Sequence, residues 1–142
     1  GNGGSAADAE HIVGVLMKSF VKKREVSEEL CGKLSEIHKE YGCKQIVFEL
    51  KNVKAIEREH INQLNRYMSD NFGRFGIIFA RNKPSKQMIQ NTIDLWSGQR
   101  RCILIMDDTD LELMRSCNAN GQRQPIEVIK KKYIEFTRMC PN

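Results

Sequence analysis

Hydrophobic and polar positions divide the chain into short, continuous apolar runs and longer segments in which apolar residues recur every three or four positions. Such runs are typical of strands buried on both faces of a sheet, and the recurrent spacing is typical of amphipathic helices. We expect strands over residues 45–51, 75–80 and 102–106. We expect helices over residues 8–23, 27–41, 57–69, 84–97, 108–114 and 126–136. This alternation predicts an α/β sheet covered by helices on both faces.

Turn and capping residues set the expected ends of several helices. Pro84 and Ser85 are expected to open the helix that follows the second strand, and Asp108 or Thr109 is expected to cap the next short helix. The acidic residues around position 108 are thereby explained as caps and as compensation for the helix dipole. Gly73 is expected to end the helix that begins near residue 57, and Gly98 is expected to break the helix that begins at Ser85.

The strand over residues 45–51 carries two charges on one face. Side chains alternate along a strand, so Glu49 and Lys51 share a face with Val47, opposite three apolar side chains. Placing charge in an apolar sheet is costly unless the charges are paired or hold a metal. A carboxylate can hold Mg²⁺, and a neighbouring lysine can orient water and offset charge on a phosphate. The pattern indicates a magnesium-dependent nuclease; a structural ion pair at a sheet edge is the alternative.

The helix after this strand adds two polar residues on one face. Gln63 and Tyr67 are four positions apart. Gln63 can both donate and accept hydrogen bonds, so it suits a water, a phosphate or a base edge. Tyr67 is able to reach a backbone phosphate or hold the Gln63 side chain. The alternative is that both residues form the solvated flank of an amphipathic helix.

Basic residues at the ends of predicted strands are candidate phosphate contacts. Arg81 and Lys83 follow the second strand, and Arg100 and Arg101 precede the third. An α/β sheet tends to place its ligand site near strand ends, and phosphates are bound by arginine and lysine. The chain has 23 Lys+Arg against 18 Asp+Glu, a net charge of +5, which is compatible with a polyanionic partner.

Length and composition predict one domain. Residues 1–7 are small and polar and predict a linker or tail, and residues 8–142 can bury a real core. No apolar run approaches the roughly 20 residues of a membrane span, so we expect no membrane partner and a cytoplasmic location. The five cysteines are odd in number and lack Cys-x-x-Cys spacing, which favours reduced thiols over a zinc site or a disulfide framework. Cys102 is expected to be a buried strand residue.

The run Glu49-Leu50-Lys51-Asn52, the following Gln63-x-x-x-Tyr67 helix and the strand over 75–81 together resemble the PD-(D/E)XK, restriction-endonuclease-like superfamily. Residues 96–114 are similar to the corresponding domain of bacterial antiphage and NTPase-linked defence proteins. The resemblance covers about residues 41–115. It implies a mixed sheet with flanking helices on both faces and hydrolysis of DNA phosphodiester bonds with Mg²⁺, for which Mn²⁺ can substitute. It also implies a defence or restriction effector, either as a homodimer or within a larger multidomain protein.

The resemblance also implies roles for individual residues. Glu49 and the backbone carbonyl of Leu50 would bind the metal, Lys51 would be the catalytic lysine and Gln63 a further catalytic residue. Tyr67 and Asn52 would be auxiliary.

The family's other metal-binding aspartate normally lies on a strand shortly before this one. The only aspartate before Glu49 is Asp8, and Glu10 could match the first-helix glutamate of some members. Three explanations stay open: the upstream hairpin is missing from this chain, an unusual acidic residue substitutes for the aspartate, or the domain is catalytically degenerate.

Two other functions stay open beside the nuclease. A catalytically degenerate nuclease-like domain would bind DNA or mediate assembly without metal, with an affinity that falls as salt rises. A Rossmann-like regulatory or interaction module would have no affinity for nucleic acid, and Glu49 and Lys51 would be merely paired. The choice between DNA and RNA is also open.

Overall fold

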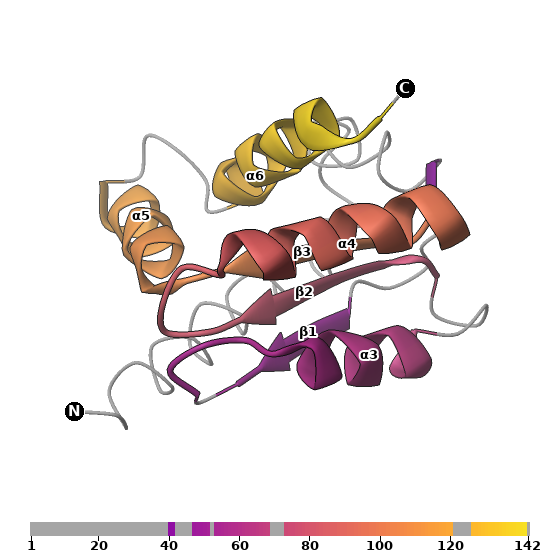
Figure 1. Ribbon diagram of the computed structural model, residues 1–142. Coiled ribbons are helices and arrows are strands. Elements are labelled where there is room, and N and C mark those ends of the chain that lie inside the picture. The colour runs from indigo at the N-terminus through magenta and orange to yellow at the C-terminus, as the bar shows by residue number, and fades with distance from the viewer. Residues whose placement is uncertain (1–39, 42–46, 52, 69–72, 121–125, 142) are drawn as a thin grey trace.

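A computed structural model gives the structure of residues 40–41, 47–51, 53–68, 73–120 and 126–141. In these ranges, β1 (Val47–Leu50), β2 (Phe75–Phe79) and β3 (Cys102–Met106) form a parallel sheet in the order β1-β2-β3. The helices of these ranges that bear on the site are α3 (Arg58–Tyr67), α4 (Lys86–Gln99), α5 (Asp108–Asn120) and α6 (Ile126–Met139). Figure 1 shows the helices packed around the sheet.

Parallel pairing aligns the ends of all three strands. Leu50 pairs with Phe79, and Phe79 pairs with Met106. The strands therefore finish at one edge of the sheet, which we call the carboxyl edge; the edge where they begin is the amino edge. Hydrogen bonds continue past the strand ends, from Lys51 N–H to the Phe79 carbonyl at 2.9 Å and from Ala80 N–H to the Met106 carbonyl at 2.9 Å.

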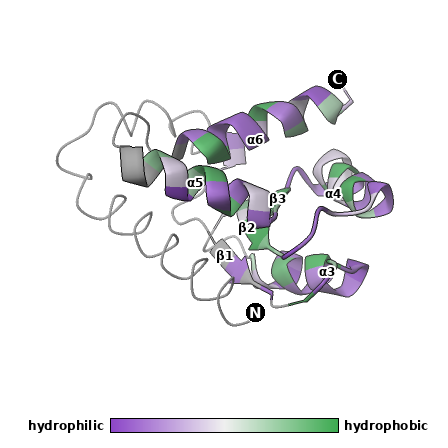
Figure 2. Ribbon diagram, turned by 90° about the vertical axis from the view of Figure 1, so that its left-hand side faces the viewer, coloured by the Kyte–Doolittle hydropathy of each residue, from purple (hydrophilic) through white to green (hydrophobic). Residues whose placement is uncertain are grey.

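Helices cover both faces of the sheet, and side chains of α4 reach the hydrophobic clusters on both. On one face, Ile78 and Ile103 pack with residues of α3, and side chains of α4 lie against the same cluster. On the other, Leu104 packs with Met114 of α5 and Phe136 of α6. Figure 2 shows α3 and α4 on one side of the strands and α5 and α6 on the other. The predicted α/β architecture with helices on both faces is confirmed. The described strands are all parallel, so the mixed sheet of the restriction-endonuclease-like fold stays a prediction.

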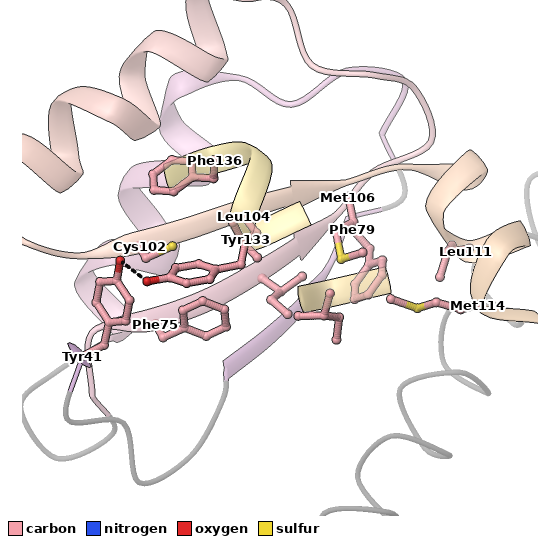
Figure 3. Packing of buried hydrophobic residues seen from close by; sticks show 12 residues of the cluster. Tyr41, Phe75, Phe79, Cys102, Leu104, Met106, Leu111, Met114, Tyr133 and Phe136 are labelled. Carbon is pink, nitrogen blue, oxygen red and sulfur yellow. Dashed lines mark hydrogen bonds between the residues drawn. The ribbon is translucent and has the colours of Figure 1, made fainter. Parts of the chain in front are cut away.

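The core under α6 is closed by a group of aromatic rings. The rings of Tyr41 and Tyr133 meet edge to face, with centroids 6.0 Å apart, and Tyr133 donates to the Tyr41 hydroxyl at 3.3 Å (Figure 3). The indole N–H of Trp96 donates to the same hydroxyl at 3.1 Å. Cys102 is buried beside them, as predicted, and burial raises the pKa of its thiol. Burial also raises the pKa of the Tyr41 hydroxyl.

The end of α4 differs from the prediction. Gly98 does not break the helix, which continues to Gln99 and ends at Arg100 in the left-handed conformation, with φ 54°. A glycine costs a helix only about 1 kcal/mol, which tertiary structure can override. The N–H of Arg100 donates to the Trp96 carbonyl at 2.9 Å, and its guanidinium lies 4.3 Å from the centroid of the Trp96 ring. The stacking offsets part of the cost of this backbone conformation.

The caps of α4 and α5 are set by local side chains. Ser85 is the N-cap of α4 and accepts from the N–H of Met88 at 3.2 Å, so this helix begins close to the predicted opening at Pro84 and Ser85. For α5 the prediction of Asp108 or Thr109 is wrong, because the Asp107 carboxylate accepts from the N–H of Thr109 at 2.7 Å and of Asp110 at 3.3 Å. The helix also runs on to Asn120 instead of ending near residue 114.

Some expectations cannot be compared with the structure. The predicted helix over 8–23 and all but the last two residues of the helix over 27–41 lie outside the described ranges. Within those ranges, no helix has both the length and the apolar character needed to cross a membrane.

Candidate active site

β1 presents Glu49 on the face of the sheet that α3 and α4 cover. Glu49 pairs with Ile78 in the parallel register, and Ile78 packs under α3. Residues paired across parallel strands point to the same face. Lys51 follows two residues later, just past the end of β1. The predicted shared face is therefore observed, and it lies at the carboxyl edge.

The two charged groups form an ion pair. Lys51 Nζ lies 2.9 Å from Glu49 Oε1, and the two side chains are 23% and 28% exposed. They are covered enough to be held in place and open enough for solvent and a ligand to reach them. Ion pairs near a surface contribute about 1 kcal/mol or less to stability. Stability alone therefore gives little reason for this pair in an otherwise apolar sheet.

α3 brings a third polar group to the same ammonium. Lys51 Nζ donates to Gln63 Oε1 at 3.4 Å. The opposite side of α3 is anchored by Ile61 and Leu64, which are buried against the sheet. The structure thus joins three of the residues selected from the sequence, and we call them the Glu49–Lys51–Gln63 cluster.

The start of α3 is fixed by reciprocal capping. The N–H of Glu57 donates to His60 Nδ1 at 3.0 Å, and the Glu57 side chain accepts from the backbone of His60. This arrangement satisfies donors that an uncapped helix start would leave without partners. His60 is therefore a capping residue and is not part of the cluster.

The other residues predicted for the site are not joined to the Glu49–Lys51–Gln63 cluster by side-chain contacts described above. Tyr67 lies one helical turn beyond Gln63, with 62% of its surface exposed. Leu50 contributes its main chain to β1. Asn52, Asp8 and Glu10 lie outside the described residues.

The four predicted phosphate-binding residues lie at two different edges. Arg81 and Lys83 follow β2 and share the carboxyl edge with Lys51. Arg100 and Arg101 precede β3 and therefore lie at the amino edge. Arg100 stacks on an indole, as described above, and Arg101 donates to the end of α3. Only the first two are at the same edge as the cluster.

The end of β1 offers some of the ligands that a divalent cation requires. The Glu49 carboxylate and the main-chain carbonyl of Leu50 are hard oxygen donors, the type that Mg²⁺ prefers. The described residues contain no group of three or more His, Cys, Asp and Glu side chains able to hold a metal together. The donors present therefore suit Mg²⁺ in kind, and further oxygen ligands are required to complete its sphere.

Sequence reasoning missed a second ion pair near the end of β3. Lys132 of α6 donates to Asp110 Oδ2 at 3.1 Å, and the same oxygen accepts from the N–H of Asp107 at 2.9 Å. Asp110 and Lys132 are 22 positions apart, and no local pattern connects them.

Comparisons with models of protein families, with curated proteins and with solved structures found no match. The functional argument consequently rests on the chemistry and geometry of the cluster, together with the resemblance of its motif.

Proposed function

We propose that this domain is a magnesium-dependent endonuclease that hydrolyses DNA phosphodiester bonds at the Glu49–Lys51–Gln63 cluster. The observation that supports it best is the position of the Lys51 ammonium, within reach of both the Glu49 carboxylate and the Gln63 amide. A role as a defence or restriction effector is part of this proposal and derives from the motif resemblance alone.

Each residue of the cluster has a separate task in this proposal. Glu49 and the Leu50 carbonyl would hold Mg²⁺ or Mn²⁺, which when bound stabilises negative charge that develops on the phosphate. Lys51 orients the attacking water and offsets charge on the scissile phosphate. The Gln63 amide oxygen keeps the Lys51 ammonium in place, because the ammonium retains one acceptor when the Glu49 carboxylate is engaged elsewhere.

Two basic residues at the carboxyl edge support a phosphate-bearing substrate. Arg81 and Lys83 follow the neighbouring strand at the same edge as Lys51. We propose that these two residues contact the DNA backbone and that Arg100 and Arg101 do not. Asp8 and Glu10 remain the candidates for a second carboxylate ligand.

Cleavage of supercoiled plasmid tests the proposal. Wild-type protein is expected to cleave with Mg²⁺ or Mn²⁺ and to stop when EDTA is added. Glu49→Gln and Lys51→Met are each expected to reduce the rate by about 100-fold or more. The matched control is Glu59→Gln, which also removes a carboxylate from an ion pair, at 2.9 Å from Arg66, but on an exposed surface of α3. Loss of cleavage in Glu59→Gln, or normal cleavage by Glu49→Gln, would contradict the proposal.

A second function is favoured by one observation. The described residues contain no group of three or more His, Cys, Asp and Glu side chains that includes Glu49 and could hold a metal, and a lone carboxylate binds Mg²⁺ poorly. A catalytically degenerate domain that binds DNA would show no cleavage by folded wild-type protein. Its DNA affinity would be independent of metal and would fall as salt rises. Absence of both cleavage and DNA binding would favour an interaction module instead.

A further inference from the structure

One arginine links the amino edge of the sheet to the end of α3. Nη1 of Arg101 lies 2.7 Å from the Asn65 carbonyl oxygen, 2.8 Å from Asn65 Oδ1 and 2.9 Å from the Met68 carbonyl oxygen. Arg101 immediately precedes β3, and Met68 is the C-cap of α3. A single nitrogen atom therefore gathers three acceptors from the last turn of that helix.

This contact stabilises the C-terminal end of α3. The last carbonyl groups of a helix have no partner within the helix, and that end carries partial negative charge. A guanidinium group donates hydrogen bonds to these carbonyl groups, and its permanent positive charge offsets the partial negative charge. The Asn65 side chain makes a second, longer contact, from Nδ2 to Gln99 Oε1 of α4 at 3.5 Å.

The anchored helix carries Gln63. Gln63 lies two residues before Asn65, so a shift or rotation of the last turn of α3 is transmitted to its side chain through rigid helical backbone. The Lys51–Gln63 hydrogen bond is 3.4 Å long, near the limit at which such a contact is effective. Movement of α3 by a few tenths of an ångström would therefore break it.

We propose that Arg101 is a positioning residue for the Glu49–Lys51–Gln63 cluster: it holds the end of α3 against the start of β3 and so keeps Gln63 within reach of Lys51. The effect on catalysis rests on the proposed nuclease function. The effect on the Lys51–Gln63 contact does not, and it can be measured separately. The same three hydrogen bonds explain why Arg101, first considered as a phosphate contact, serves the protein interior instead.

The test compares Arg101→Ala and Arg101→Lys with Arg100→Ala. Arg100 is the matched control, since it is the neighbouring arginine but stacks on Trp96 of α4. For Arg101→Ala we expect kcat for plasmid cleavage to fall about 10- to 100-fold, the scale expected for slight misplacement of a catalytic group, with KM for DNA within about twofold of wild type. Millimolar guanidinium is expected to restore part of the rate to Arg101→Ala and none to Lys51→Met.

The second measurement needs no activity. NMR of the Lys51 side-chain ammonium and the Gln63 side-chain amide is expected to show shifted signals in Arg101→Ala and wild-type signals in Arg100→Ala. Asn65→Ala, which removes only one of the three acceptors, is expected to give a smaller shift and replaces Arg101→Ala if that variant does not fold.

The outcomes separate the two proposals. If wild-type protein does not cleave, the nuclease proposal fails, and the NMR signals alone decide the role of Arg101. Wild-type Lys51 and Gln63 signals in the folded Arg101 variants, or equal effects of the Arg100 and Arg101 substitutions, would overturn the inference. Shifted signals with intact cleavage would overturn its catalytic part.

Discussion

Replacing Gly76 by alanine is expected to destabilise the domain by about 1–2 kcal/mol. Gly76 is the second residue of β2, on the face of the sheet that α3 covers. A Cβ atom at this position would lie 2.7 Å from the sulfur of Met68 and 3.2 Å from Leu64 Cδ2. Ordinary carbon contacts are about 3.5–4.0 Å, so either the Met68 side chain or the helix itself must move.

The expected magnitude is the difference between two terms. Overpacking a well-filled core costs about 1–3 kcal/mol. Removing a glycine from a strand recovers roughly 0.5–1 kcal/mol, because the unfolded chain loses conformational freedom. The balance is a net loss in the free energy of unfolding. The overpacking arises where α3 packs against β2. We therefore also expect the Lys51–Gln63 hydrogen bond to weaken in this variant.

Urea denaturation of two glycine variants measures the steric term. Gly98→Ala is the matched control: the substitution is the same, but nothing lies within 4 Å of the added Cβ atom. It is expected to stabilise the domain by roughly 0.5–1 kcal/mol. The two variants should thus change the free energy of unfolding in opposite directions.

A second background provides a stricter check. In Met68→Ala, which lacks the sulfur atom, Gly76→Ala is expected to become neutral or stabilising. If Gly76→Ala stabilises the wild-type protein as much as Gly98→Ala does, the close packing of α3 on β2 is wrong. An unchanged penalty in the Met68→Ala background would show that Met68 is not the obstructing group.

Two further predictions concern stability. Ser85→Ala is expected to cost about 1 kcal/mol in a urea titration through loss of the α4 cap, whereas Ser97→Ala, exposed on the same helix, should stay within about 0.5 kcal/mol of wild type. Burial raises the pKa of Cys102, so the native state holds this proton more tightly than the unfolded state. The contribution of this thiol to the free energy of unfolding should be constant below about pH 8 and then fall, by at most about 1.4 kcal/mol per pH unit. Titrations at several pH values should show a shallower fall in Cys102→Val, and a slope unaffected by that substitution would refute the assignment.

The helices and strands of the core were predictable because several apolar positions in each one indicate the same structure. Cys102–Met106 is apolar at every position, and the structure buries every one of its residues. Ile61, Leu64 and Met68 recur at helical spacing and pack against the sheet, as expected. Local pattern and burial agree at these positions, so the sequence alone identifies both the strand and the helix.

The cluster was predictable for a topological reason. Lys51 and Gln63 are twelve residues apart, at the end of a strand and within the helix that follows it. In a strand–helix–strand unit, that helix packs back on the same sheet, which limits where the two side chains can lie. The motif resemblance selected the same residues, but the restriction-endonuclease-like fold itself remains a prediction.

The role of Arg101 was not predictable, because its partners are more than thirty residues away. Its acceptors belong to Asn65 and Met68, and no periodic pattern connects them with the start of β3. The four arginine and lysine candidates were also grouped without distinguishing the two ends of a strand. In a parallel sheet, residues before a strand and residues after it lie at opposite edges, and this distinction separates Arg101 from Arg81.

The end of α4 and the start of α5 were predicted at the wrong residues. The sequence favoured Gly98 as a helix breaker, whereas the turn is made by Arg100, whose guanidinium stacks on a ring that only the folded helix presents. Asp107 is one of several acidic residues around position 108, and its position directly after β3 makes it the cap of α5. In both cases several neighbouring residues were suitable, and the sequence pattern alone did not choose among them.

The measurement that tests the central claim most directly is a double-mutant cycle on the rate of plasmid cleavage in Mg²⁺. The cycle compares wild type with Glu49→Gln, Lys51→Met and the double variant. Residues that act as one catalytic unit are expected to show strong non-additivity. We predict that each single variant loses about 100-fold or more and that the double variant is no slower than the slower single variant. Wild-type rates in either single variant, or losses that multiply in the double variant, would contradict the proposed site.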